Sequence, residues 1–252
     1  VDPVNPGRHA AIAHLPGPIG GLLAHPDGDF ILAACDNMIH ILDPFSGSPI
    51  RPPIQFKYPL RGYSLSRDGS HLAIGGRWNQ YAVWDTTNWE KVQSFENLKQ
   101  SFGFVGFLAN GAILAGELNG KVSIREAQTG KLLAGFQLPC TLNCAALSPD
   151  GNTLAIGSMQ RGLRLVDSMT GIELMKPFIL PEPAVEIVWH PDGHSIFARN
   201  TLGMVRQFDT ATLRPIGPPI AERASSLAVS REGGVVWIAH PRHVFSRAIS
   251  DE

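Results

Sequence analysis

The sequence lacks the features that mark disulfide-rich, membrane-spanning and secreted proteins. It contains three cysteines, Cys35, Cys140 and Cys144, at spacings that match no disulfide framework, which indicates a reducing compartment or free thiols. We interpret Cys140 and Cys144 as small buried residues, because a metal or redox pair requires a tighter motif. No apolar run approaches the roughly 18 residues of a membrane helix, and no signal peptide is visible. We therefore expect a cytoplasmic protein with no membrane partner.

Neither sign of charge dominates. The chain has 21 basic and 22 acidic residues, for a net charge of −1. This balance argues against a nucleic-acid partner held by a general basic field, although a local basic patch stays open. Hydrophobic residues make up 44 % of the chain, which is enough for a core. No stretch of useful length has a helical pattern.

A short turn recurs along the whole chain. Asp-Gly or a close variant closes it at residues 25–28, 66–69, 109–111, 148–151, 190–193 and 230–233. Its glycines are separated by steps of 41, 42, 40, 42 and 40 residues. This period, with turns between short apolar runs, predicts a β-propeller with one blade per repeat.

A second marker keeps the same period. One or two apolar residues stand in the two places before an acid at Asp43, Asp85, Glu126, Asp167 and Asp209, in steps of 42, 41, 41 and 42 residues. With one acid per blade, the carboxylates are too far apart for paired catalysis. We expect each of them to accept N–H bonds from its own turn.

At these residues the chain resembles the WD-repeat family. Trp84-Asp85 is the dipeptide that gives the family its name, Ser148-Pro149-Asp150-Gly151 is its usual a–b turn, and Thr129-Gly130 and Thr170-Gly171 fit its next turn. The resemblance covers about residues 8–250. The repeats are degenerate and mutually divergent, like those of bacterial members. The family's inward Asp-His-Ser/Thr-Trp network is mostly missing, so apolar packing must hold most blades.

We therefore predict an all-β fold, a single six-bladed β-propeller of four-stranded antiparallel blades. Residues 1–7 form an extended lead-in and residues 8–252 the propeller. The repeats are expected at about 16–57, 58–98, 99–139, 140–181, 182–221 and 222–252. The strand predicted at residues 9–15 completes the last blade and closes the ring, as in the family, which removes exposed edges.

Details of the strands can also be predicted. Strand b is a continuous apolar run, as in Leu72-Ala73-Ile74, which indicates cover on both faces. The outer strands d are expected at about 49–57 in the first blade and 173–179 in the fourth. Prolines at 49, 52, 53 and 177 suit an edge, because proline cannot donate to a ladder. Trp189 is predicted to wedge between blades.

Sites for catalysis and metal are weakly supported. No Gly-x-Ser-x-Gly elbow follows a strand, and His25 and His190 are better explained as turn residues. His240 and His243 could begin a metal site, but no third ligand is fixed. Glu186 is the one acid near the expected channel mouth, too few for a calcium cage. We predict no enzyme activity, cofactor or metal. A propeller hydrolase with a metal at the channel mouth stays an alternative.

The b–c and d–a loops of a propeller share one face, and here that face is rich in arginine and aromatic residues. Such residues dominate interaction hot spots. The WD-repeat resemblance implies a non-catalytic scaffold or sensor, a monomer binding a protein or peptide on this face. A structural spacer within a larger protein is a second alternative. The candidate binding residues are Tyr58, Arg61, Arg77, Trp78, Lys99, Met159, Arg161, Glu182, Arg223, Arg242 and His243.

Overall fold

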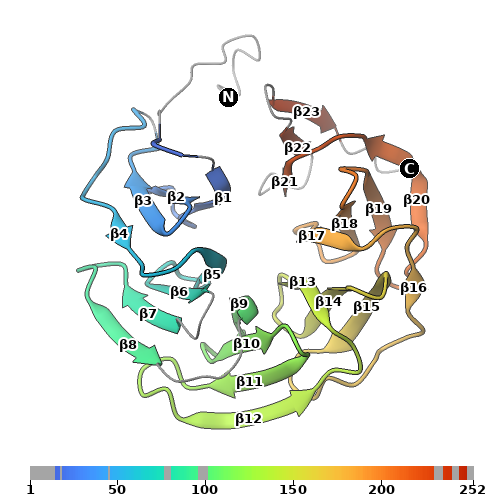
Figure 1. The fold of residues 1–252 in the computed structure, drawn as a ribbon, viewed down its shortest axis with the longest axis horizontal. Coiled ribbons are helices and arrows are strands. Elements are labelled where there is room, and N and C mark those ends of the chain that lie inside the picture. Colours follow the sequence, from blue (N-terminus) through green and yellow to red (C-terminus); the bar gives the residue numbers. More distant parts are fainter. Residues whose placement is uncertain are drawn as a thin grey trace.

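Figure 1 shows antiparallel sheets arranged around a central axis, each sheet with one strand next to the axis. The computed structural model describes residues 15–17, 19–44, 46–76, 81–95, 102–229, 235–239 and 244–248. This part of the chain contains strands and turns but no helix. It therefore has no helix that could cross a membrane.

The first three blades follow in chain order. Blade 1 consists of β1 (Ile19–Ala24), β2 (Ile31–Cys35), β3 (Met38–Leu42) and β4 (Ile54–Gln55). Blade 2 consists of β5 (Leu60–Leu65), β6 (His71–Gly76), β7 (Tyr81–Asp85) and β8 (Lys91–Phe95). Blade 3 consists of β9 (Phe102–Phe107), β10 (Ile113–Glu117), β11 (Lys121–Arg125) and β12 (Leu132–Gln137).

The remaining sheets continue the same order. Blade 4 consists of β13 (Leu142–Leu147), β14 (Thr153–Ser158), β15 (Gly162–Asp167) and β16 (Phe178–Ile179). Blade 5 consists of β17 (Ala184–Trp189), β18 (Ser195–Asn200), β19 (Val205–Asp209) and β20 (Pro215–Ala221). The last sheet, called sheet 6 below, contains β21 (Ser226–Val229), β22 (Val235–Ala239) and β23 (Val244–Ala248).

The number of complete blades differs from the prediction. The described residues build five four-stranded blades and a sixth sheet of three strands, so six four-stranded blades are not confirmed. The closing strand predicted at residues 9–15 lies almost entirely outside the described residues, as does the lead-in at 1–7. The all-β class and the four-stranded antiparallel blade are confirmed.

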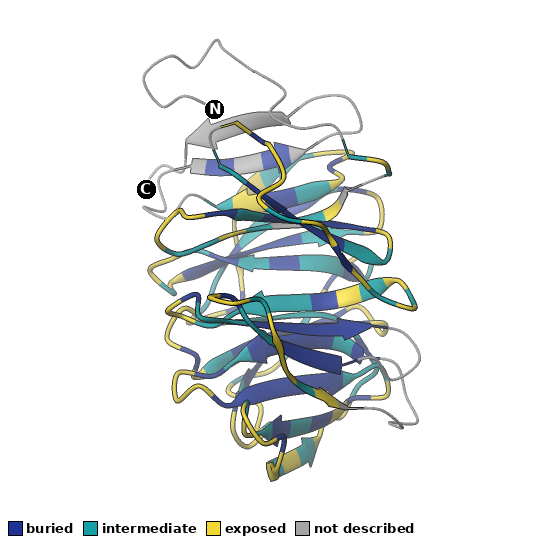
Figure 2. Ribbon diagram, turned by 90° about the vertical axis from the view of Figure 1, so that its left-hand side faces the viewer, coloured by how far each residue is buried: buried dark blue, intermediate teal, exposed yellow. Residues whose placement is uncertain are grey.

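The second strand of each blade forms the buried core. Leu72 in β6, Leu114 in β10 and Ile196 in β18 are each 0 % exposed. Figure 2 shows buried residues in the middle of the sheets and exposed residues mainly in the turns. Continuous apolar runs are buried on both faces because each sheet is covered by its neighbours.

The turns are held by their own polar side chains, as expected. Asp43 and Asp209 accept hydrogen bonds from the backbone N–H groups of Ser46 and Thr212 at 2.6 and 2.8 Å. Ring Nδ1 of His25 accepts the Asp27 N–H at 3.3 Å. The recurring acids are therefore turn residues, which agrees with the prediction.

The outer strands are of two kinds. β8 pairs with β7 along most of its length in blade 2, and β12 pairs with β11 in the same way in blade 3. In blade 1, β4 is reduced to two residues after Pro52 and Pro53, and in blade 4 β16 is reduced to two residues after Pro177. The expected outer strands at 49–57 and 173–179 are thus too long, because proline removes ladder donors.

A long polar side chain accompanies each of the two shortened outer strands. Three places before the turn acid stand His40 and Arg164 in blades 1 and 4, against Ala82 and Ser123 in blades 2 and 3. Arg206 holds this place in blade 5, although its outer strand β20 has seven residues. The guanidinium of Arg164 pairs with Glu173 in the outer segment of its own blade. We infer that the larger side chains occupy space left where the fourth strand leaves the ladder.

Trp189 confirms the predicted wedge. It is 9 % exposed and packs with residues of blades 4 and 5, and its indole N–H donates to the carbonyl oxygen of Ala146 at 2.9 Å. The side chain thus connects the inner strands of two blades by packing and by one hydrogen bond.

Candidate functional site

The b–c turns and d–a segments meet on one face, which we call the upper face. The backbone N–H of Leu142 donates to the carbonyl of Leu118 at 2.9 Å, and that of Ala224 donates to Gly203 at 2.8 Å. In each case the segment that enters one blade is bonded to the b–c turn of the blade before it. The loops of the upper face are consequently fixed to one another across the blade boundaries.

Two arginines occupy unusual backbone positions on this face. Arg161 has φ = +64° and Arg223 has φ = +59°, a region that non-glycine residues adopt only at some cost. The carbonyl of Arg161 accepts a bond from Leu180 N–H at 2.8 Å. Both side chains are exposed, so tight turns present two cations to solvent.

Two apolar side chains stand on neighbouring blades of the same face. Met159 is 53 % exposed and Leu202 is 67 % exposed. Leu202 belongs to the b–c turn of blade 5, where its backbone N–H donates to the Asn200 side chain at 3.0 Å. Because polar bonds hold the turn, the apolar side chain is left outside. Together with Arg161 and Arg223, these residues form what we call the upper-face patch.

A cavity of about 650 Å³ lies at the axis, lined by the innermost strands. Gly20, Ser64, Gly106 and Ala146 contribute small side chains or none to its wall. The charged residues of its lining are Asp36, Arg61, Arg67, Asp150, Glu186 and Arg199. Tyr63 and Asn143 add polar groups.

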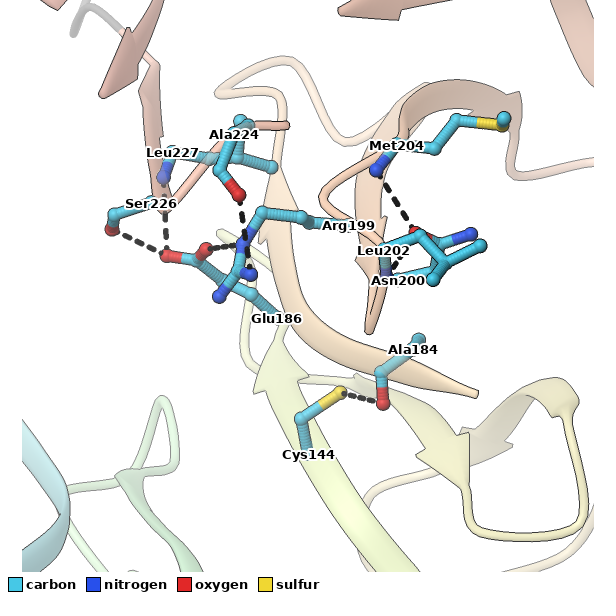
Figure 3. Close-up of polar contacts among 10 residues, drawn as sticks. All are labelled: Cys144, Ala184, Glu186, Arg199, Asn200, Leu202, Met204, Ala224, Ser226 and Leu227. Atoms are coloured by element: carbon cyan, nitrogen blue, oxygen red, sulfur yellow. Dashed lines mark hydrogen bonds and ion pairs between the residues drawn. The ribbon is translucent and has the colours of Figure 1, made fainter. Parts of the chain in front are cut away.

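Glu186 and Arg199 form the main polar contact of this channel (Figure 3). The Arg199 Nε–H donates to Glu186 Oε2 at 2.7 Å, and Nη1 donates to the carbonyl of Ala224 at 3.5 Å. Glu186 Oε1 accepts the Ser226 hydroxyl at 2.8 Å and the Leu227 N–H at 3.2 Å. Oε1 thus joins blade 5 to sheet 6, whereas Oε2 holds Arg199 within blade 5, from where Arg199 reaches the Ala224 carbonyl.

Other groups near the channel are kept neutral by burial. Desolvation, reinforced by the negative charge of Glu186, raises the pKa of Tyr63 to about 12. Burial raises the pKa of the Cys144 thiol to about 12, and its Sγ donates to the Ala184 carbonyl at 3.4 Å. Burial also raises the pKa of Cys140. All three cysteines are free, and a thiol held protonated is a poor nucleophile.

Metal ligands are not grouped in the part of the chain that the structure describes. No three His, Cys, Asp or Glu side chains there are placed to hold a metal ion. Glu186, the acid that the sequence places near the channel mouth, is bonded to Ser226, Leu227 and Arg199. His240 and His243 lie outside the described residues.

Comparison with known proteins agrees with this architecture. A family model described as WD domain, G-beta repeat matches residues 9–43, a segment that ends on the first recurring acid, Asp43. A curated relative from Synechocystis sp., an uncharacterized WD repeat-containing protein, is 26 % identical over 152 residues. The alignment covers 59 % of this chain and 43 % of the relative.

Together with the blades, these two similarities support a WD-repeat propeller. Its one Trp-Asp pair shows how far it departs from the family's hydrogen-bond network. The indole N–H of Trp84 is buried without a hydrogen-bond partner in the described structure, while Asp85 accepts the Thr87 N–H at 2.8 Å within its turn. Trp84 instead packs against the apolar core cluster of blades 1 and 2.

The structure places six of the eleven predicted binding residues. Arg61, Met159, Arg161 and Arg223 are exposed, whereas Tyr58 and Glu182 are half-buried. Arg61 also lines the mouth of the channel. The five others, Arg77, Trp78, Lys99, Arg242 and His243, lie outside the described residues.

Leu202 is not among the binding residues predicted from the sequence. The signal that the sequence offers is a leucine in a polar loop directly before a glycine. Arg199 is not among them either, because its link to Glu186 depends on a register that sequence does not show.

Proposed function

We propose that this WD-repeat chain is a non-catalytic platform that binds a protein or peptide on its upper face. The observation that carries the proposal is the upper-face patch. Met159 and Leu202 are more than half exposed on neighbouring blades, with Arg161 and Arg223 beside them in tight turns. Exposed apolar groups flanked by arginine have the composition of interaction hot spots.

Rigidity supports this role. The b–c turn of blade 5 is fixed by a backbone bond to the segment that enters sheet 6, from the Ala224 N–H to the Gly203 carbonyl at 2.8 Å. Binding to a surface that is already ordered loses less conformational entropy. WD-repeat propellers generally mediate protein–protein interaction, and this chain has the fold for it.

The proposal retains the residues that sequence alone indicates. Arg77, Trp78, Lys99, Arg242 and His243 extend the patch around the same face if the repeat register continues through their loops. It also includes closure of sheet 6 by residues 9–15. The family model matches a segment that begins at residue 9, which supports counting this stretch as part of the propeller.

The alternatives differ in what they require. A hydrolase requires a metal or nucleophile at the channel mouth, and the WD-repeat family is typically non-catalytic. A spacer requires no conserved chemistry on the upper face. The exposed pair Met159 and Leu202 favours the binding platform over the spacer, because a spacer gains nothing from apolar side chains held in solvent.

The test is quantitative affinity capture from a lysate of the source organism. The bait is compared with a Met159→Ser/Arg161→Ala/Leu202→Ser variant. The matched control is Ile172→Ser/Ile179→Ser, which changes two side chains that are each 66 % exposed in the outer segment of blade 4. All three proteins must melt at the same temperature.

We expect at least one protein to be captured by the bait and by the control variant and to be lost with the upper-face variant. Equal capture by all three proteins would refute the upper face as the binding surface. Capture by none of them would favour the spacer.

A further inference from the structure

The face opposite the upper-face patch carries a groove between blades 4 and 5. The groove has a volume of about 540 Å³, and the a–b turns at residues 148–150 and 191–194 line it. Leu165 and Trp189 also line it and are 2 % and 9 % exposed. The volume lies in the range of known ligand sites, and buried apolar side chains form part of the wall.

Leu174 borders the groove and is half exposed. Its exposed fraction is 51 %, although the same groove contains the nearly buried Trp189. Leu174 follows the turn acid of its blade by seven places. The same place in blade 1 holds Ile50, which is 52 % exposed and is not among the residues lining this groove. Leu174 is thus about as exposed as Ile50, but of the two only Leu174 lines this groove.

The groove is also negatively charged. Asp150 and Asp192 line it, and Arg67 is the one lysine or arginine among its lining residues. The Ser148 hydroxyl and the Asn152 N–H hold the pKa of Asp150 below its usual value. Desolvation raises the pKa of Asp192, but bonds from His194 N–H and His190 outweigh it and the pKa is lowered. Both carboxylates therefore stay ionised at neutral pH.

The surrounding turns add two acids, with Arg214 beside the second of them in blade 5. Asp167 and Asp209 occupy the c–d turns of the two blades that form the groove, on the same face as the a–b turns. Hydrogen bonds from Thr170 hold the pKa of Asp167 below its usual value. A negative field over an apolar groove attracts a cationic partner and excludes an acidic one.

We propose that this groove binds a basic segment of a partner protein in which lysine or arginine alternates with aliphatic residues. The aliphatic side chains pack on Leu174 and Trp189, while the cations face Asp150 and Asp192. This second surface lies on the opposite side of the ring from the upper-face patch. It would allow the propeller to hold two partners at once.

The probe is a fluorescein-labelled hexapeptide of alternating lysine and leucine, titrated with the full chain and followed by fluorescence anisotropy. We expect Leu174→Ser to weaken binding by about fivefold, because it removes apolar contact without touching the core. Asp150→Asn with Asp192→Asn should weaken binding by about tenfold at low salt and flatten its salt dependence.

Two controls separate the groove from general attraction. Ile50→Ser removes an aliphatic side chain of equal exposure in blade 1 and should leave binding unchanged. A peptide of alternating lysine and serine should bind at least about fivefold more weakly than the leucine peptide. The proposal is overturned if Leu174→Ser and Ile50→Ser bind alike, if the serine peptide binds as tightly, or if the unmodified protein does not bind.

Binding of the lysine–leucine peptide in the groove is expected not to depend on the upper face. The Met159→Ser/Arg161→Ala/Leu202→Ser variant should bind the lysine–leucine peptide as the unmodified protein does. Loss of peptide binding in that variant would place the peptide on the wrong face and overturn the groove proposal. Failure of the lysate capture experiment would leave the peptide result unaffected.

Discussion

Blades 1 to 3 are joined to one another near the axis by different chemistry from blades 4, 5 and sheet 6. Between blades 1 and 2, the Tyr63 ring enters the space beside Gly21, where an added Cβ would lie 1.5 Å from the hydroxyl oxygen. Between blades 2 and 3, Phe102 covers Gly75, whose added Cβ would lie 3.3 Å from the Phe102 Cβ. Aromatic side chains packed on glycine make these boundaries.

The later boundaries use polar side chains as well. Asn143 Nδ2 and Cys144 Sγ both donate to the Ala184 carbonyl, at 2.6 and 3.4 Å, between blades 4 and 5. Glu186 and Arg199 then join blade 5 to sheet 6. The difference shows that one repeated architecture accepts two solutions: an aromatic ring packed beside glycine, and hydrogen bonds from side chains to the neighbouring blade.

The largest loss of stability is expected for Trp189→Ala, which removes both packing and a hydrogen bond between blades 4 and 5. A cavity left by a large aromatic side chain costs about 3–5 kcal/mol of unfolding free energy. Urea unfolding should show that loss. Trp189→Phe keeps most of the packing and should lose only about 1 kcal/mol, the value of the hydrogen bond. A loss below about 1 kcal/mol in the alanine variant would contradict the wedge.

Gly21→Ala tests the steric boundary in the other half. The new methyl group would occupy the position of the Tyr63 hydroxyl, and overpacking of this kind costs about 1–3 kcal/mol. Combining it with Tyr63→Ala should cost less than the sum of the two single changes, because the clash disappears. Additive losses in the urea unfolding of all four proteins would show that the two side chains are not coupled.

Glu186→Gln should have the smallest effect. The amide can still accept one bond, but Arg199 loses its counter-charge at side-chain exposures of 17 % and 23 % for the two partners. We expect a loss of about 1–2 kcal/mol in urea unfolding. Glu182→Gln, at the half-buried entry to the same blade, is the matched control and should change stability by less than about 0.5 kcal/mol. Equal losses in both variants would mean that the pair contributes nothing specific.

The regular parts of the molecule could be predicted because local pattern determines them. A buried second strand needs a continuous apolar run, and Asp43 or Asp209 needs only its own turn to find a partner. The outer strands could not be placed as well. Pro52 and Pro177 indicate an edge, but pairing along the edge depends on the neighbouring strand, where His40 and Arg164 take up room.

The polar boundary of the later blades required the structure. Glu186 was recognised as an isolated acid, yet its partner Arg199 is thirteen residues away on the adjoining strand, and the register shifts between Ala184 and Glu186. Leu202 was hidden for a related reason. The sequence shows that its loop exists, but the side-chain direction depends on how the Asn200 amide binds the turn.

The close fit of Tyr63 beside Gly21 also bears on how the ring assembles in the right order. Repeats with similar strands and turns could dock beside the wrong neighbour while the chain folds. The other inner strands present different groups: Gly62 meets the backbone of Val105, and Gly157 meets Ala184. A blade that docked beside the wrong neighbour would clash with a side chain at the boundary. Because the repeats differ in sequence, each blade fits best against its own neighbour. Identical repeats would lack this specificity.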